Sequence, residues 1–350
     1  MSQRTVAGVL AVPLLIGLWA AALFTPLPYV TYEPGITVDL LSETEDGELL
    51  QVQGHKTYRD DGEMLLTTVY VSRPKATVNL FEVVRAWIDD DDAVVPYDAV
   101  YDSGTTPEES EQRGAMLMAT SQETAVAVAL REAGFEVEES VQVSEVSEGM
   151  PAEGVLEVGD ELLEVGGRDV TSSQDVVDAV SAAPAGEPLE LLVRRDGREL
   201  PLEVSPREVD GTPRLGIMTG YGFDLPFEVT LDVDPAIGGS SAGLMFALSV
   251  YDTLTPGSLT GGQVIAGTGT VDDQGQVGPI GGIAQKIAAA RDEGARLFLV
   301  PPDNCGEALG ADPDDMRLVR AETVSSALDS LERWVEDPDA DLPRCERSSE

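Results

Sequence analysis

The most constraining feature of this sequence is a long uncharged run at its amino-terminal end. No charged residue lies between Val6 and Tyr32, and the core of the run reads VAGVLAVPLLIGLWAAALF. One helix of this length is about enough to cross a bilayer, which takes about 20 residues. Arg4 precedes the run and Glu33 follows it, so the positive-inside rule places the short end in the cytoplasm. The run predicts that residues 1–27 form a cytoplasmic tip and a single-pass transmembrane anchor.

A cleaved signal peptide is the alternative, because the small residues in WAAA resemble a cleavage site. The length of the apolar run favours an uncleaved anchor in the cell membrane. Under both interpretations the bulk of the chain is extracytoplasmic. Cys305 and Cys345 would then meet an oxidising medium and form a disulfide, two free buried thiols being the other alternative.

The composition excludes several classes of function. The chain has 64 acidic residues against 22 Lys and Arg, a net charge of -42, so it would repel nucleic acid and anionic lipid. His55 is its single histidine, which disfavours a histidine-based hydrolase and excludes metal sites built from several His or Cys ligands. The three lysines, Lys56, Lys75 and Lys286, follow His, Pro and Gln, so there is no Walker A loop. We expect no cofactor, no metal and no ATP.

One lysine occupies an unexpected position. The stretch GGIAQKIAAARDEGA, residues 281–295, predicts a helix that begins after a glycine turn and ends at a glycine. Ile283, Ile287 and Ala290 form its apolar stripe, and Lys286 falls on the same face. A lysine there either extends its ammonium to water along the apolar surface or is desolvated, which lowers its pKa and makes it a base.

A pair of serines lies at the predicted start of another helix. The stretch LDVDPAIGGSSAGLMFALSV, residues 231–250, predicts a strand, a Pro/Gly-rich turn and an apolar helix. A serine at a helix N-terminus has backbone N–H donors beside it that can stabilise an oxyanion. Simple N-capping is the alternative role. We expect Ser240 near the cap and Ser241 projecting as a nucleophile.

Residues 136–208 read as short strands around one central helix, Ser173 to Ala182. This segment resembles a PDZ domain, chiefly in VSEVSEGMPAEGVLEVGDELLEVGGRDV, where Gly159-Asp160 and Gly166-Gly167 mark turns. The resemblance implies a small β-barrel with helices that binds peptides by strand addition.

The expected ligand loop of this PDZ-like segment is GFEVEES, which begins at Gly134. Glu136, Glu138 and Glu139 would oppose the carboxylate of a bound C-terminus, so internal or unfolded segments are equally plausible ligands. A PDZ domain that only packs against the rest of the chain is the alternative.

Residues Glu228 to about Pro338 resemble the proteolytic domain of Lon-type serine peptidases. The resemblance rests on GGSSAG, the Thr-Gly hairpin in QVIAGTGTVDDQGQV, and GGIAQK. It implies Ser241 as nucleophile, Lys286 as general base and Thr268 as the residue that orients Lys286 by a hydrogen bond. Ser240 replaces a proline often found before the catalytic serine, which leaves some ambiguity about which serine attacks.

Together these features predict an α+β protein: a Lon-type proteolytic domain with an inserted PDZ domain and one N-terminal transmembrane helix. The combination resembles the membrane-anchored YlbL-type peptidases of bacteria. It implies an ATP-independent serine endopeptidase that cleaves unfolded or flexible exported polypeptides, with oligomerisation left open. The predicted divisions are 1–27 for the anchor, 28–135 for an N-terminal segment of the protease unit with a helix at 118–135, 136–208 for the PDZ domain, 209–338 for the protease domain and 339–350 for a tail.

Two other functions fit parts of the sequence. The first is a membrane-tethered PDZ binding module or adaptor whose protease fold is catalytically silent. The second is a Ser-Lys processing enzyme of the signal-peptidase kind, which GGSSAG and GGIAQK disfavour.

Overall fold

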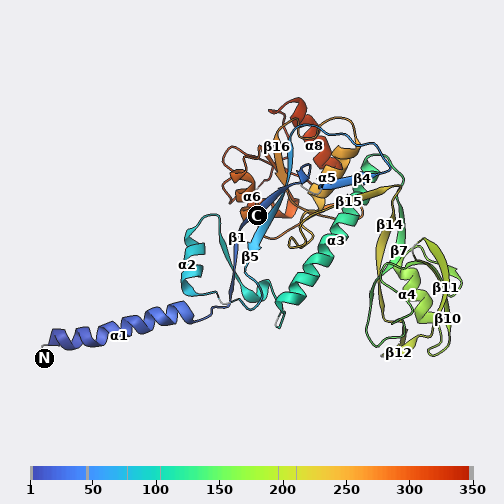
Figure 1. Ribbon diagram of the computed structural model, residues 1–350, viewed down its shortest axis with the longest axis horizontal. Helices are drawn as coiled ribbons and strands as arrows, with labels where there is room; N and C mark the ends of the chain where they lie inside the picture. Colours follow the sequence, from blue (N-terminus) through green and yellow to red (C-terminus); the bar gives the residue numbers. More distant parts are fainter. Residues whose placement is uncertain are drawn as a thin grey trace. The chain divides into compact units, whose positions relative to one another are not determined.

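The chain divides into two compact units in the computed structural model. The structure describes residues 3–44, 47–76, 78–102, 104–195, 197–209 and 211–346. For residues 3–9, 21 and 44 it describes the backbone but not the side chains. The first unit combines Met1–Gly134 with Phe227–Glu350, and the second, Phe135–Pro226, is inserted between them (Figure 1). Parts of the predicted anchor and of the predicted tail, residues 1–2 and 347–350, lie outside the described residues.

The second unit extends further along the chain than the expected PDZ boundary at residue 208. Strand β14 (Ile217–Asp224) pairs antiparallel with β7 (Glu138–Val146) over the whole of its length. Residues 209–226, expected in the protease segment, therefore belong to the inserted unit. The sequence signal was missed because β14 contains two glycines and reads as a weak strand.

The first unit is a mixed α/β domain. Its central sheet has the order β20-β19-β16-β5-β1-β6. Strands β20, β19, β16 and β5 run parallel, while β1 pairs antiparallel with β5 and β6. The bounds of the sheet strands are β1 Tyr29–Asp39, β5 Glu63–Val71, β6 Ala93–Pro96, β16 Val264–Gly267, β19 Leu297–Val300 and β20 Arg317–Arg320. The small pairs are β2 Glu43–Thr44 with β3 Gly47–Glu48, β4 Leu50–Gln53 with β15 Glu228–Leu231, and β17 Thr270–Val271 with β18 Val277–Gly278.

Two helices, α5 and α6, cover opposite faces of this sheet. The helices of the first unit are α1 Gln3–Phe24, α2 Leu80–Ile88, α3 Pro107–Glu132, α5 Gly243–Leu254, α6 Ile283–Asp292, α7 Cys305–Ala308 and α8 Val324–Glu336, with short 3-10 turns η1 Tyr97–Ala99 and η2 Pro302–Asn304. Helix α6 packs on the face that presents Leu65 and Phe298. A Cβ added at Gly267 would meet Met245 of α5 at 2.7 Å, so α5 packs close to that strand position. Because successive strand residues point to opposite faces, Ala266 toward α6 and Gly267 toward α5 place the two helices on opposite sides.

Helix α3 begins earlier than residue 118. Thr106 and Glu109 form a reciprocal capping box around Pro107, the first helical residue, which are strong helix-start signals. The expected helix at 118–135 therefore starts too late, since residues 107–117 are helical as well. The helix ends before Gly134, which has φ of +86°, a conformation that glycine adopts most easily.

Cys305 and Cys345 form a disulfide that ties the segment after α8 to the start of α7. The bond closes a loop with a sequence separation of 40. In the chain-entropy model a loop of this size contributes about 4 kcal/mol to the free energy of unfolding. The alternative of two free thiols does not hold.

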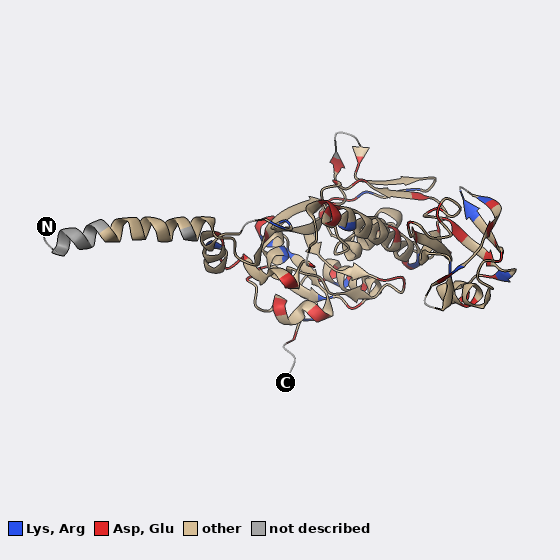
Figure 2. Ribbon diagram, turned by 90° about the horizontal axis from the view of Figure 1, so that it is seen from below, with Lys and Arg blue, Asp and Glu red and all other residues tan. Residues whose placement is uncertain are grey.

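The N-terminal helix α1 exposes apolar side chains, among them Leu14, Ile16 and Phe24. Within the described part of the chain, no helix combines the length and the apolar character needed to cross a membrane, so the structure does not support the expected transmembrane span. Figure 2 shows acidic residues in both units and neither charge colour on the described residues of α1.

The described residues of the second unit form one sheet, one helix and a hairpin. The sheet order is β11-β10-β8-β7-β14, with β9 paired to β8. It is an open sheet with edge strands β11 and β14 rather than the expected small barrel. The remaining bounds are β8 Glu161–Val165, β9 Arg168–Asp169, α4 Ser173–Ala182, β10 Leu189–Arg195, β11 Arg198–Val204, β12 Arg207–Val209 and β13 Thr212–Arg214. Helix α4 has the predicted bounds, and its Val176 and Val180 join the core of this unit.

Candidate active site

Two of the three predicted site residues are in direct contact. The Nζ atom of Lys286 donates a hydrogen bond to Oγ of Ser241 at 3.0 Å. It donates a second one to the backbone carbonyl of Thr67 in β5 at 2.8 Å. The lysine therefore bridges the serine and the sheet, and its ammonium does not extend to water.

Lys286 is among the largest fully buried side chains in the described part of the chain, with 2% of its surface exposed. Burial lowers the pKa of its ammonium from the ordinary 10.5 to about 7. The cause of this decrease in pKa is the desolvation of the ammonium by burial. A lysine with this pKa is substantially neutral at pH 7 and above, so its nitrogen has a lone pair with which to accept a proton.

The start of α6 places the lysine. Ile283, Ile287 and Ala290 are fully buried, as the apolar stripe predicts. Gly282, the N-cap, has φ of +71°, and a Cβ there would meet the side chain of Val69 at 2.9 Å. Glycine is therefore required at residue 282, since any side chain would push α6 away from β5.

Ser241 lies in the turn between β15 and α5. Gly239 donates its N–H to the carbonyl of Gly114 in α3, and Cβ atoms added at Gly238 would crowd the Gly114 backbone at 3.1 Å. The serine turn therefore rests directly on α3. Helix α5 begins at Gly243 with Ala242 as N-cap and no side-chain capping bond, so the expected capping role of Ser240 is wrong.

Thr268 lies directly after β16 and contacts the serine rather than the lysine. Its hydroxyl donates to the carbonyl oxygen of Ser241 at 2.9 Å, and the Gly269 N–H donates to the same oxygen. The Lys286 ammonium donates to Ser241 and Thr67. Thr268 therefore holds the backbone of the serine turn, and the expected orienting bond to Lys286 is made by the Thr67 carbonyl instead.

We expect Thr268→Val to lower kcat by about fivefold while KM stays unchanged, because one hydrogen bond of about 1 kcal/mol that positions Ser241 is lost. The Gly269 N–H continues to satisfy the Ser241 carbonyl. Thr253→Val in α5 is a matched control, since its buried hydroxyl has no hydrogen-bond partner in the described part of the chain. Steady-state peptide hydrolysis by both variants tests this role; equal losses in the two would contradict it.

A cleft of about 300 Å³ opens onto Ser241 and Lys286. Its lining also includes residues 66–70 of β5 and apolar residues from three other parts of the first unit: Ile36, Met118 and Ile237. Strand β5 pairs with β16 only as far as Leu66, whereas its pairing with β1 continues to Val71. Residues 67–70 thus have one sheet edge without a paired strand in the described chain, and this edge borders the cleft. An extended peptide is the ligand that suits such an edge.

The sequence did not reveal the supporting residues of the site. Ser121 of α3 donates its hydroxyl to the Ser240 carbonyl at 3.2 Å, and Gly114 contacts the serine turn. Thr67 accepts the hydrogen bond from Lys286 through its backbone carbonyl. Every residue has such a carbonyl, so the sequence cannot indicate which one is used. The small residues Gly114 and Ser121, seven positions apart on one helix face, were the available sign of close packing.

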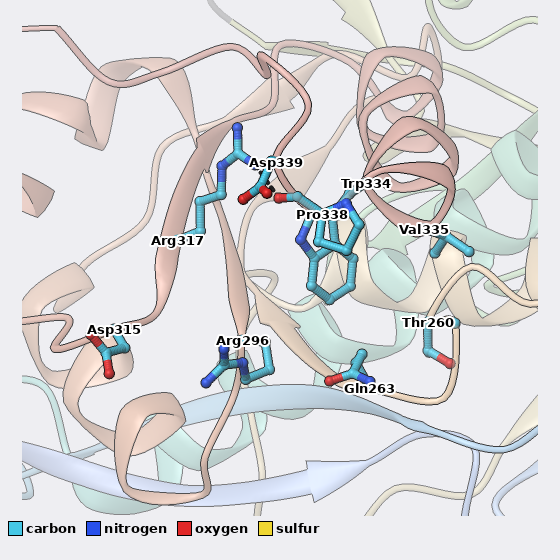
Figure 3. Close-up of a pocket in the computed structure, with 10 residues that line it drawn as sticks. Thr260, Gln263, Arg296, Asp315, Arg317, Trp334, Val335, Pro338 and Asp339 are labelled. Atoms are coloured by element: carbon cyan, nitrogen blue, oxygen red, sulfur yellow. Dashed lines mark hydrogen bonds between the residues drawn. The ribbon is translucent and has the colours of Figure 1, made fainter.

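A second cavity of the first unit has different chemistry. It measures about 380 Å³ and lies between the end of α8 and the amino ends of the parallel strands (Figure 3). Arg296, Arg317, Asp315, Asp339 and Trp334 line it. None of these lining side chains combines a serine hydroxyl with a buried lysine, as Ser241 and Lys286 do in the cleft. Among the described residues, no group of three or more His, Cys, Asp or Glu side chains is arranged to hold a metal.

The second unit has its own groove, of about 620 Å³, between α4 and the start of β14. Apolar residues Val176, Val180, Leu215 and Ile217 line it, together with Arg214. The expected ligand loop at residues 134–140 does not line it, since Glu138 and Glu139 lie in strand β7. The predicted repulsion of a peptide carboxylate by those residues is therefore wrong for this groove.

Comparisons with known proteins agree with the two units. The family model of the Lon protease (S16) C-terminal proteolytic domain matches residues 235–330, which contain Ser241, Thr268 and Lys286. The chain is thus similar to Lon proteases in the region that holds these three residues. The PDZ family model matches residues 114–205, so the match starts within α3, before the inserted unit begins.

Similar proteins cover parts of the chain. This Lon-like chain is 27% identical to the Lon protease of Campylobacter concisus over 168 residues, 47% of the chain and 20% of the relative. It is 31% identical to the archaeal Lon protease of Archaeoglobus fulgidus over 101 residues, 29% of the chain and 16% of the relative. It is 39% identical to the serine protease HTRA1 of Xenopus tropicalis over 69 residues, 19% of the chain and 15% of the relative.

The chain thus spans a fifth or less of the length of these relatives. Among solved structures, the PDZ domain of an SdrC-like protein from Listeria innocua is similar, with 27% identity and a TM-score of 0.22. The similarity covers 23% of this chain and 92% of that domain.

Proposed function

We propose that the chain is an ATP-independent endopeptidase that uses a Ser241–Lys286 dyad to cleave unfolded or flexible polypeptides. The observation that carries the proposal is the 3.0 Å hydrogen bond between the buried Lys286 ammonium nitrogen and the Ser241 hydroxyl oxygen. A serine hydroxyl is a weak nucleophile unless a neighbouring base removes its proton. The depressed pKa of Lys286, about 7, makes it such a base near neutral pH.

The reaction follows in two halves. Neutral Lys286 takes the proton of the Ser241 hydroxyl as Oγ bonds to the peptide carbonyl carbon, and the resulting ammonium protonates the leaving amine as the C–N bond breaks. In the second half Lys286 takes a proton from water, which attacks the acyl carbon, and returns the proton to Ser241 Oγ. The amino end of α5 begins at Gly243, so its positive dipole end favours the oxyanion.

The substrate class follows from the cleft. A narrow cleft beside an unpaired strand edge admits one extended chain, and folded domains do not present one. The sequence has no Walker A loop for ATP-driven unfolding. Substrates would therefore be polypeptides that are already flexible, and the apolar groove of the PDZ domain would capture or gate them.

The decisive test is digestion of fluorescently labelled casein by the purified full chain in detergent, with and without ATP. We expect cleavage at the same rate in both reactions, and no cleavage of a tightly folded control protein. Strict dependence on ATP would contradict the ATP-independent mechanism. Binding of casein without any cleavage would favour the alternative of a catalytically silent, tethered PDZ module.

We also propose that α1 anchors the chain in the cell membrane and that the two units lie outside the cytoplasm. Apolar side chains on α1 are exposed in every direction, including Leu14, Leu15, Ile16 and Leu18, and water is a poor environment for such a helix. After expression in a bacterium, the chain should sediment with membranes, resist a carbonate wash and keep an N-terminal tag. A soluble product that has lost the tag would support the cleaved signal peptide instead.

A further inference from the structure

Helix α2 exposes an unusual amount of apolar surface for its nine residues. Trp87 is 82% exposed and Ile88 75%, while Leu80, Phe81 and Val84 are each more than a third exposed. At 100° per residue these five side chains occupy one face of the helix, which we call the α2 apolar face. A soluble domain rarely leaves such a cluster uncovered.

Helix α2 packs on the domain through its other faces, so the α2 apolar face points away from the domain. The helix contacts β1 and β6, and its one buried residue is Ala86, next to the half-buried Val83. Arg85, on the polar side, forms an ion pair with Glu33 of β1 at 2.5 Å. A capping box at Asn79 closes the amino end. The helix is thus held in place by other faces, and the α2 apolar face does not contribute to the core.

The α2 apolar face is continuous with α1. The Trp19 ring of α1 stacks on the Phe81 ring of α2, with centroids 4.9 Å apart, and Figure 1 shows α2 beside the carboxyl end of α1. Helix α1 exposes apolar side chains at successive positions from Leu14 to Ile16 and at Leu18, which point in all directions around its axis. A protein partner covers one side of a helix, whereas lipid surrounds it. The continuous surface therefore fits a bilayer better than a second protein.

The charge next to this face identifies the kind of lipid. Four aspartates, Asp89 to Asp92, follow α2 directly, and the chain carries a net charge of -42. An anionic bilayer would repel this region, whereas zwitterionic headgroups would not. Trp side chains favour the boundary between headgroups and acyl chains. An exposed Trp87 near one end of an amphipathic helix suits that depth.

We propose that the α2 apolar face lies in the headgroup boundary of a zwitterionic bilayer and holds the first unit at the membrane surface. This inference rests on the proposed membrane anchor. It adds a second contact, parallel to the membrane surface, which fixes the orientation of the first unit and would keep its catalytic cleft at a constant height above the lipid. Helix α2 then acts as an interfacial helix and not as a span.

The test uses tryptophan fluorescence of the full chain in phosphatidylcholine vesicles whose acyl chains carry bromine at a shallow or a deep position. Trp19→Phe leaves Trp87 as the reporter of α2, and Trp87→Phe leaves Trp19 as the reporter of α1. Trp334, 6% exposed in α8, stays in both variants, and the double variant gives its background. Phenylalanine keeps an aromatic ring at each position.

We expect shallow bromines to remove most of the Trp87 fluorescence and to shift its emission to the blue, with deep bromines much less effective. Replacing half of the lipid with phosphatidylglycerol should reduce the quenching of Trp87 by the shallow bromines and its blue shift. Casein cleavage should be unchanged in Trp87→Ser, as in the control Val335→Ser on the surface of α8. These results together would support the interfacial position of α2.

Two outcomes would overturn the inference while leaving the anchor in place. The first is quenching of Trp19 without quenching of Trp87, which would place α2 in water. The second is a blue shift of Trp87 that depends on protein concentration and occurs without vesicles, which would identify a second copy as the partner. If neither tryptophan is quenched, the anchor and the inference both fail, while the peptidase proposal is judged separately by casein cleavage.

Discussion

Ser241→Ala should abolish casein cleavage, lowering kcat/KM by at least about 10³-fold, because the nucleophile is removed and no covalent intermediate can form. The fold should remain intact, since Lys286 keeps its hydrogen bond to the Thr67 carbonyl. The free energy of unfolding should change by no more than about 1 kcal/mol, the value of one hydrogen bond. Casein hydrolysis and urea denaturation of the same preparation measure both quantities.

Ser240→Ala is the matched control for this loss. The Lys286 ammonium contacts the hydroxyl of Ser241, whereas Ser240 accepts a hydrogen bond from the Ser121 hydroxyl through its backbone carbonyl. An alanine keeps that carbonyl, so cleavage should fall by less than about threefold. If Ser240→Ala were inactive and Ser241→Ala active, the assignment of the nucleophile would be wrong.

The sequence predicted the elements that depend on local pattern. The α6 helix and its buried stripe followed from the spacing of Ile283, Ile287 and Ala290, and the PDZ helix was expected at Ser173 to Ala182, as observed. The pairing of Ser241 with Lys286 was expected from a family resemblance, because 45 residues separate them and no local rule joins such distant positions. The structure supplies the contact itself.

What the sequence could not predict depends on backbone atoms and long-range pairing. The Thr67 carbonyl that holds Lys286 belongs to a strand 219 residues away. The hydroxyl of Thr268 was expected to bond to Lys286, but it donates to the Ser241 carbonyl. The sequence does not show which of two nearby groups a hydroxyl bonds to, because that depends on the geometry of the turn. The PDZ groove was placed at residues 134–140, since the pairing of β14 with β7, which creates the actual groove wall, joins segments about 80 residues apart.

Lys286→Met should abolish cleavage as completely as the loss of the serine, because it keeps the length and apolar stem of the side chain but removes the base. Lys56→Met, at an exposed lysine outside the cleft, is the control and should retain wild-type activity. Lys286→Arg should also be inactive, since a guanidinium stays protonated at all accessible pH values. Unlike the Met variant it should lose stability, because a permanent charge is then buried.

The pH dependence of the wild-type enzyme provides the independent check. Only the neutral amine accepts a proton, so kcat/KM should rise about tenfold per pH unit in acid and level off above the Lys286 pKa of about 7. Lys286→Met should show no such titration in any residual activity. A wild-type profile that is flat from pH 5 to 9 would contradict a lysine base.

Stability should follow the same titration with a predictable sign. The pKa of Lys286 is about 7 in the folded chain and near 10.5 when unfolded. Between these values the unfolded chain binds more protons, so this residue makes stability rise with pH across that window. At pH 6 the lysine is protonated in both states, so the full desolvation penalty lowers the free energy of unfolding.

Lys286→Met removes that penalty, which amounts to about 1.4 kcal/mol per pKa unit. The loss of the hydrogen bond to Thr67 offsets about 1–2 kcal/mol of this gain. The Met variant should therefore be more stable than wild type at pH 6, and the advantage should shrink as the pH approaches 10.5. Urea denaturation at pH 6 and pH 10 measures this difference; an advantage that is equal at both would show that the buried lysine is not the group that titrates.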